Sequence, residues 1–339
     1  MSSEIILEVT NLAVEFATYG GSVQAVRDVS FNLHKGTTLA IVGESGCGKS
    51  VTVQTLLGLI PMPPGRITAG SARLRGAELL GLSADRLNHY RGKRIGMIFQ
   101  DAMSAMNPTM TIGDQIAETL IVHMGMSAAA ARQEVITLLT QVQIPEPERR
   151  LRQYPFEFSG GMLQRAMIAL SIACQPEVLI ADEPTTALDV TIQAQILQLL
   201  ESLQQSRGLS IILITHDLGV VARMAHEVAV MYAGQIVEQG CVDDIFYRSA
   251  HPYTVGLKAA MPGRSAHKSV LQEIPGSPPD LFAPPAGCGF NARCPHVMQL
   301  CTSQAPALFG TSHQARCWLQ HAAAPAQALH QQLIASVRS

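Results

Sequence analysis

Short apolar runs that each end in a polar residue or a glycine recur along the chain and predict buried strands. Four such runs cover residues 38–42, 95–99, 178–182 and 210–215. Continuous apolar runs of this length are typical of strands buried on both faces of a parallel sheet. Between them lie longer segments with apolar residues at helical spacing, such as residues 191–207. Strands that alternate with helices predict an α/β fold with a mostly parallel sheet.

Three segments depart from this alternation. Residues 5–33 contain several strand-like stretches around a turn at Gly20-Gly21, and they predict a small antiparallel β subdomain. Residues 111–173 have a largely helical pattern, in which Ser127 is a good N-cap. Residues 228–238 have the pattern of a β-hairpin. The sequence therefore predicts a central α/β core with a β subdomain and a helical subdomain.

The composition is that of a globular protein of about two domains. The chain has 339 residues, of which 47% are hydrophobic and 15% charged, and this argues against long disordered regions. Its net charge of −2 gives no reason to expect binding to nucleic acid or anionic lipid. No run reaches the ~18 apolar residues of a membrane span, and the first residues lack the pattern of a signal peptide. We expect a soluble, cytosolic protein that reaches a membrane only through another chain.

The first buried run leads into the sequence Gly43-Glu44-Ser45-Gly46-Cys47-Gly48-Lys49-Ser50, which matches the phosphate-binding pattern G-x-x-x-x-G-K-[ST]. The glycines let successive backbone N–H groups curve around a phosphate. A helix expected from Lys49 to about residue 59 adds its partial positive charge. Lys49 would reach the β- and γ-phosphates, and Ser50 would bind Mg²⁺. The alternative is a plain glycine turn, which does not account for eight residues in register.

Polar side chains also follow the other buried runs. Gln100 follows the second run, Asp182 and Glu183 end the third, and His216 follows the fourth. Ligands of α/β proteins bind at the carboxyl ends of parallel strands. Asp182 could hold Mg²⁺, Glu183 could polarise an attacking water, and His216 could contact the γ-phosphate or that water. The alternative is a pair of surface acids and a structural histidine.

Two further features have both a structural and a functional interpretation. Ser159-Gly160-Gly161 opens an apolar helix, either as an ordinary cap or as a second phosphate-binding helix start. Tyr19 lies beside the predicted turn of the β subdomain, either as an ordinary strand-end residue or as a face that stacks on a base.

Taken in order, these motifs resemble the ATP-binding subunit of an ABC transporter over roughly the first 250 residues. The resemblance implies that Asp182 is the Walker B aspartate, Glu183 the catalytic glutamate and His216 the switch histidine. It implies that Gln100 is the Q-loop glutamine and that Asp189 lies in the D-loop. Ser159, Gly160 and Gly161 match the signature motif, although Met162 stands where that motif usually ends in glutamine. Tyr19 is similar to the adenine-stacking aromatic residue.

The resemblance also implies the ligand sets. ATP would be contacted, besides the residues above, by Gly43, Glu44, Ser45, Gly46, Cys47, Gly48, Lys49, Ser50 and Val51. Mg²⁺ would be held by Ser50, Gln100 and Asp182, and catalysis would involve Glu183, His216 and Gln100.

The sequence His251-Pro252-Tyr253-Thr254, with the segments 65–67 and 99–108, is similar to the dipeptide, oligopeptide and nickel branch of the importers. We therefore expect an ABC nucleotide-binding domain over 1–248, with its helical subdomain at about 111–173. A peptide-importer C-terminal extension would cover 249–320, followed by an Ala/Gln-rich tail over 321–339.

The function implied is ATP hydrolysis that powers import of dipeptides or oligopeptides. Its partners would be a second ABC ATPase subunit, two transmembrane permease subunits and a solute-binding protein. The second ATPase would be a paralogue, as is common in the resembling importers, with a copy of this chain as the alternative. The chain would lie on the cytoplasmic face of the inner membrane, and residues 103–108 would meet the permease. Alternatives are the same machinery importing nickel, a metal chelate or glutathione, a soluble ABC ATPase outside transport, and a regulatory subunit with an inactive site. Intact Lys49, Asp182, Glu183 and His216 argue against the last.

Four of the seven cysteines, Cys288, Cys294, Cys301 and Cys317, fall in a Pro/Gly-rich segment with few apolar residues. Such a segment needs a cross-link or a metal to become ordered. Four thiolates suit an iron–sulfur cluster or Zn²⁺, and the lack of close C-x₂₋₄-C pairs favours a [4Fe–4S] cluster. Related peptide-importer subunits are thought to carry one. Zinc and unliganded thiols are the alternatives.

Overall fold

The computed structural model describes residues 4–186, 188–260 and 273–324, so most of the predicted tail over 321–339 lies outside the described residues. The chain divides into two compact units. Of the described residues, the first contains 4–7, 33–38, 74–186 and 188–215, and the second contains 8–32, 39–73, 216–260 and 273–324.

The first unit contains three buried parallel strands. They are β6 (Ile95–Ile98), β7 (Val178–Asp182) and β8 (Ser210–Thr215). Ile95 pairs with Val178, and Val178 pairs with Ser210. Every residue of the three strands is buried, as the continuous apolar runs predict. The prediction of parallel strands is confirmed.

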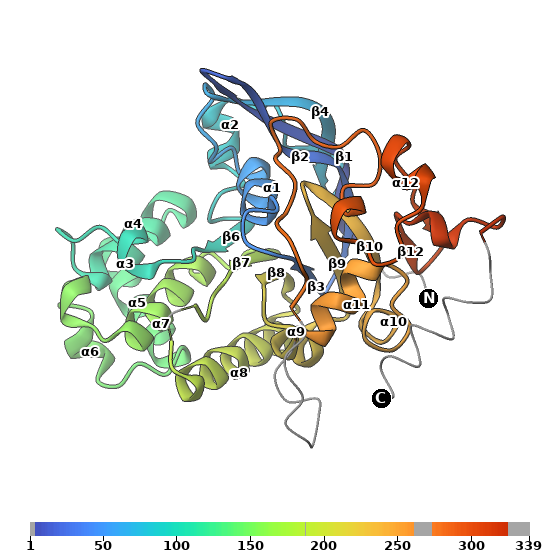
Figure 1. Ribbon diagram of the computed structural model, residues 1–339. Helices are drawn as coiled ribbons and strands as arrows, with labels where there is room; N and C mark the ends of the chain where they lie inside the picture. The colour runs from blue at the N-terminus through green and yellow to red at the C-terminus, as the bar shows by residue number, and fades with distance from the viewer. Residues whose placement is uncertain (1–3, 187, 261–272, 325–339) are drawn as a thin grey trace. The chain divides into compact units, whose positions relative to one another are not determined.

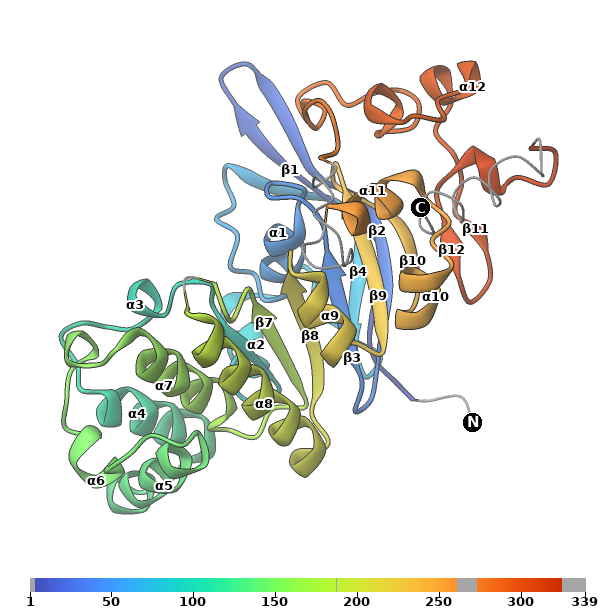
Figure 2. The same cartoon turned by 60° about the horizontal axis from the view of Figure 1, so that its bottom comes forward.

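Helices make up most of the rest of this unit. The helices α4 (Ile112–Met124), α5 (Ala128–Gln141), α6 (Pro147–Arg150) and α7 (Gly160–Ile172) gather at one end of it (Figures 1 and 2). The long helix α8 (Val190–Arg207) follows β7. Smaller elements are β5 (Ala77–Glu78), α2 (Ala84–Asn88), α3 (Ala102–Ala105) and a 3₁₀ turn at Pro155–Glu157.

The helix starts in this unit follow their capping residues. The side chains of Thr111, Ser127, Ser159 and Asp189 each accept a hydrogen bond from a backbone N–H in the first turn of α4, α5, α7 and α8. Such bonds satisfy donors that have no partner within the helix. The cap predicted at Ser127 is confirmed.

The second unit contains most residues of each of three N-terminal strands, β1 (Ile5–Thr18), β2 (Gly21–His34) and β4 (Gly65–Leu74). They lie in one sheet in the order β2-β1-β4. It also holds β3 (Thr38–Val42), which runs parallel to β9 (Glu227–Tyr232). The turn Ala233-Gly234 joins β9 to β10 (Gln235–Cys241) in the predicted hairpin. Its helices include α1 (Lys49–Leu56), α9 (Leu218–Met224) and α10 (Val242–Tyr247).

The C-terminal segment, whose described residues are 249–260 and 273–324, packs against β10. It contains α11 (Pro252–Ala259), α12 (Gln299–Ser303), β11 (Phe309–Gly310), β12 (Gln314–Ala315) and two 3₁₀ turns, Asn291–Arg293 and Trp318–Gln320. β12 pairs antiparallel with β10, with Ala315 opposite Glu238. The ring of Phe290 packs at 5.3 Å from Tyr232 and 5.5 Å from Tyr253. The segment therefore shares a hydrophobic core with the strands of the second unit.

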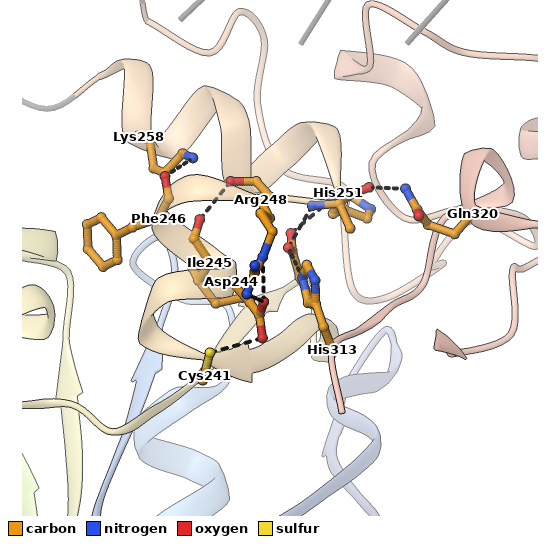
Figure 3. A network of polar contacts seen from close by, with 12 residues as sticks. Cys241, Asp244, Ile245, Phe246, Arg248, His251, Lys258, His313 and Gln320 are labelled. Atoms are coloured by element: carbon orange, nitrogen blue, oxygen red, sulfur yellow. Dashed lines mark hydrogen bonds and ion pairs between the residues drawn. The ribbon is translucent and has the colours of Figure 1, made fainter. Parts of the chain in front are cut away.

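A buried carboxylate fastens this segment in place (Figure 3). Glu238 of β10 has no exposed surface. It accepts hydrogen bonds from the backbone N–H groups of Ala250 at 2.7 Å and His251 at 2.9 Å, and it contacts Nε2 of His313 at 2.8 Å. One side chain thus joins the start of α11 to the residues before β12.

Two local predictions need correction. The helix after the phosphate loop ends at Leu56 rather than near residue 59, because Gly58 adopts a left-handed conformation with φ 58°. The first strand-like stretches form one strand, β1, with Asn11 at φ 50° inside it. In the described part of the chain, no helix is long and apolar enough to cross a membrane.

Candidate nucleotide-binding site

The phosphate loop has backbone conformations that favour glycine. Gly43, Gly46 and Gly48 have φ of 158°, 78° and 105°. A Cβ on Gly43 would lie 2.1 Å from the carbonyl oxygen of Met231, and one on Gly48 would lie 2.4 Å from that of Ala25. The loop therefore lies directly against neighbouring backbone at Gly43 and Gly48, and glycine is sterically required at these two positions.

Lys49 lies over the loop rather than in solvent. It is 5% exposed, and its Nζ donates to the carbonyl oxygens of Gly43 and Glu44, both at 2.9 Å. The Cys47 carbonyl accepts a hydrogen bond from the N–H of Gly234 at 3.0 Å, which ties the loop to the β9–β10 turn. Burial raises the pKa of the Cys47 thiol. The ammonium group is thus held over the loop by two backbone carbonyl oxygens, and its contact with phosphate stays a prediction.

Near the end of β7, the structure brings the predicted residues Gln100 and Glu183 together. Asp182 is the last residue of the strand and is 2% exposed. Glu183 follows with φ 47°, and its N–H donates to the carbonyl of Ile214 at 2.9 Å. Its carboxylate accepts hydrogen bonds from Gln100 Nε2 at 3.1 Å and from Thr186 Oγ1 at 2.8 Å. Gln100 and Glu183 therefore form one polar cluster at this strand end.

The signature and D-loop residues start two neighbouring helices. Ser159 caps α7, and both Ser159 and Gly160 are exposed. Asp189 caps α8 by accepting from Ile192 N–H at 2.9 Å. A Cβ on Gly161 would lie 2.8 Å from Cγ2 of Ile192, so a glycine lets the start of α7 approach α8 closely. These residues have clear structural roles, and their contact with nucleotide stays a prediction.

His216 and Tyr19 lie where the sequence places them. His216 directly follows β8 and precedes Asp217, which caps α9 through the N–H groups of Gly219 and Val220. Tyr19 lies in the turn between β1 and β2 with its side chain fully exposed. An exposed ring is accessible for stacking on a base, and this role of Tyr19 stays a prediction.

The four late cysteines line one pocket of the second unit. Cys288, Cys294, Cys301 and Cys317 share it with His251. Burial raises the pKa of Cys294 to about 11 and that of Cys317 to about 12. Among residues 4–186, 188–260 and 273–324, however, no group of three or more Cys, His, Asp or Glu side chains is arranged to hold a metal ion. The structure thus supports a shared pocket and not a formed metal site.

Sequence reasoning missed three residues that surround the loop, namely Tyr232, Tyr253 and Arg293. Tyr253 Oη accepts a hydrogen bond from the N–H of Glu44 at 3.0 Å, and Arg293 Nη1 lies 2.9 Å from Glu44 Oε2. Tyr253 belongs to the His-Pro-Tyr-Thr sequence that marks the peptide-importer branch, which was the one available signal. Nothing local to Arg293 indicates its partner.

Comparison with known proteins identifies the family. The model of the ABC transporter family matches residues 26–186, and that of the oligopeptide/dipeptide transporter C-terminal region matches residues 237–301. The dipeptide transport ATP-binding protein DppD of Bacillus subtilis is 54% identical over 319 residues, which cover 94% of this chain and 95% of that protein. The chain is a member of the ABC transporter ATP-binding family. It is therefore an ATPase of the ABC type with an α/β P-loop fold.

Other relatives of this ABC ATPase agree. The oligopeptide transport ATP-binding protein OppD of Bacillus subtilis is 55% identical over 323 residues, with 94% of this chain and 90% of that protein covered. A solved dimer of the ATP-binding cassette MJ0796, in a post-hydrolysis state with ADP and phosphate, superimposes with a TM-score of 0.63 at 26% identity. The superposition covers 70% of this chain and 98% of the MJ0796 chain.

Proposed function

We propose that this ABC ATPase powers the import of dipeptides or oligopeptides. The observation that carries the proposal is the phosphate loop, with Lys49 held over it, in a chain whose curated relatives are named for dipeptide and oligopeptide transport. ATP would bind along residues 43–51, with its base against Tyr19. Oxygen donors of the type supplied by Ser50, Gln100 and Asp182 suit Mg²⁺, which would neutralise phosphate charge when bound.

Glu183 would orient and deprotonate the attacking water, and His216 would contact the γ-phosphate. The hydrogen bonds that hold Glu183 support this role, because a general base must be fixed in place. The exposed Ser159 and Gly160, with Gly161 and Asp189, would meet ATP bound to a second ABC subunit. Bound ATP would thus stabilise the association of two such subunits, and hydrolysis would let them separate.

The remaining partners would be two permease subunits and a solute-binding protein, with this chain on the cytoplasmic face of the inner membrane. Exposed apolar side chains on the helices that follow Gln100 support a permease contact. Met103 is 49% exposed, and Val122 and Met124 of α4 are 68% and 48% exposed. Exposed apolar patches mark interaction sites when they are large and contiguous, so these side chains are candidates for the permease contact.

The test is uptake of a labelled dipeptide and of labelled nickel in cells that lack this chain. The cells are complemented with the wild type or with Glu183→Gln. We expect that wild type alone restores dipeptide uptake. If nickel uptake but not dipeptide uptake depends on the chain, the cargo is nickel and not a peptide. If neither uptake depends on the chain, a role in import is refuted.

We further propose that the cysteine pocket holds a [4Fe–4S] cluster that orders the C-terminal segment. An unpartnered polar atom supports the fit. His251 is 1% exposed, its Nδ1 accepts from Tyr253 N–H at 3.0 Å, and its Nε2 has no hydrogen-bond partner. A neutral ring whose Nδ1 accepts must carry its proton on Nε2. The pocket thus combines four thiols with a buried donor, which suits anionic sulfur.

Analysis of iron, acid-labile sulfide and zinc in protein purified without oxygen tests this proposal. We expect about four irons and four sulfides per chain in the wild type, and loss of both in Cys294→Ser. Stoichiometric zinc would assign a zinc site instead. Full metal content in Cys294→Ser, or no metal in the wild type, would contradict a four-cysteine site.

A further inference from the structure

The phosphate loop is held from outside by the C-terminal segment. Glu44, its second residue, is bound twice by that segment. Its backbone N–H donates to Tyr253 Oη at 3.0 Å, and its Oε2 receives Arg293 Nη1 at 2.9 Å. The carbonyl of the same residue accepts from Lys49 Nζ at 2.9 Å. Glu44 therefore connects the lysine that would contact phosphate with residues more than 200 positions later.

Arg293 is itself fixed by several further contacts. Its Nε donates to the carbonyl of Pro275 at 3.0 Å, and its Nη2 donates to that of Ile274 at 3.2 Å. Its Nη1 also lies 3.2 Å from Tyr232 Oη, and its side chain is 6% exposed. A guanidinium group with this many fixed acceptors is pre-organised and loses little further freedom when it pairs with Glu44.

The charge balance gives this pair a consequence for ATP. The Glu44 side chain is 25% exposed and adjoins a loop whose ligand carries several negative charges. In the ion pair, the positive charge of Arg293 balances the negative charge of the Glu44 carboxylate. Without Arg293, a half-buried negative charge would remain next to the phosphates, and unpaired charges of this kind are costly.

We propose that Arg293 is a positioning residue of the ATP site, which neutralises Glu44 and fixes the loop so that the C-terminal segment completes the site. This inference rests on the proposed ATP-binding role of residues 43–51. It differs from that proposal because Arg293 acts through Glu44 and need not touch the nucleotide. It also gives the segment that follows the nucleotide-binding core a direct part in binding.

The test is the dissociation constant of a non-hydrolysable ATP analogue, measured on the full chain. We expect Arg293→Met to weaken binding about tenfold to a hundredfold, because an unpaired carboxylate would remain beside the phosphates. The double variant Arg293→Met with Glu44→Gln should recover most of that loss, because no carboxylate is left to repel phosphate. KM for ATP should rise in Arg293→Met more than kcat falls, since the catalytic residues are untouched.

A second arginine of the same segment is the matched control. Arg316 pairs with Asp28 of β2 at 2.6 Å and also donates to the carbonyl of Ile236. Arg316→Met should therefore leave ATP affinity unchanged while removing an equally long-range ion pair. If Arg293→Met fails to fold, Arg293→Lys serves in its place, with a smaller loss that Glu44→Gln again relieves.

Three results would be decisive. Wild-type affinity in a folded Arg293→Met protein would overturn the proposal. So would a loss that Glu44→Gln does not relieve, because Arg293 would then act only through packing of the segment. Lys49→Ala separates the two proposals, since normal ATP affinity in that variant would refute the assignment of the loop itself.

Discussion

Glu183 combines a strained backbone with a fixed carboxylate. Its φ of 47° lies in the left-handed region, which a non-glycine residue adopts at a cost of about 1–3 kcal/mol. The bond from its N–H to Ile214 and the two bonds to its side chain hold it there. Strain that is maintained by surrounding contacts is common where a side chain must be aimed at a reacting atom.

We expect Glu183→Gln to bind ATP with near-normal affinity and to hydrolyse it at least about a hundredfold more slowly, because removal of a general base typically costs 10²–10⁴ in rate. The amide can still accept from Gln100 and Thr186, so the local structure should persist. Single-turnover ATPase measurements with analogue binding in parallel provide the check. Near-wild-type hydrolysis would show that another group activates the water.

Among the elements, helix starts were the most predictable features and also the hardest to interpret. Asp189 shows why, because its carboxylate caps α8 and also lies in the expected D-loop. A capping residue satisfies backbone donors in any helix, so its presence alone does not indicate contact with a partner subunit.

Two substitutions at Asp189 separate these roles. Asp189→Ala should lower the free energy of unfolding by about 1 kcal/mol, because Ala cannot cap. Asp189→Asn keeps a capping oxygen and should keep that stability. Urea unfolding measures the difference, and ATPase activity measures the second role. If Asp189→Asn is fully stable but hydrolyses ATP slowly, the carboxylate acts beyond the helix, whereas equal instability of both variants would contradict the cap.

The pairing of β10 with β12 should depend on pH. The hydrogen bond that His313 donates to the carboxylate of Glu238 raises the pKa of His313 above its ordinary value, and burial opposes this shift. The charge of Asp244 also raises it, and that of Arg248 lowers it. A raised folded-state pKa contributes stability that is fully present below the ordinary value of about 6.5 and is lost as pH rises through the folded-state value.

We therefore expect the melting temperature to fall as pH is raised from about 6 toward 8 through this ionisation. His313→Gln keeps a donor for Glu238 and carries no titrating charge, so its melting temperature should change less across the same range. Thermal melts of both proteins at matched ionic strength provide the comparison. Parallel pH profiles would show that His313 does not contribute.

At the scale of the whole molecule, local pattern accounts for the strands and not for what surrounds the loop. The run 178–182 predicts a buried strand because every residue of it is apolar until Asp182. The pairing of Gln100 with Glu183 follows from adjacent parallel strands, β6 and β7. Arg293 and Glu44 are 249 positions apart, and neither has a local pattern that specifies the other. Packing of the C-terminal segment creates that contact, so it required the structure.

This shared packing predicts a response of the C-terminal segment to nucleotide. Phe290 packs on Tyr232 and Tyr253, and Arg293 binds Glu44, so ordering of the phosphate loop should stabilise residues 288–294. A ligand that binds only the closed form of a region suppresses its local opening. Hydrogen exchange measured with a saturating ATP analogue should show slower exchange in residues 288–294 as well as in the loop. In Lys49→Ala, at a concentration where analogue does not bind, neither region should change. Protection of the loop alone would show that the C-terminal segment is packed on the nucleotide site without being coupled to it.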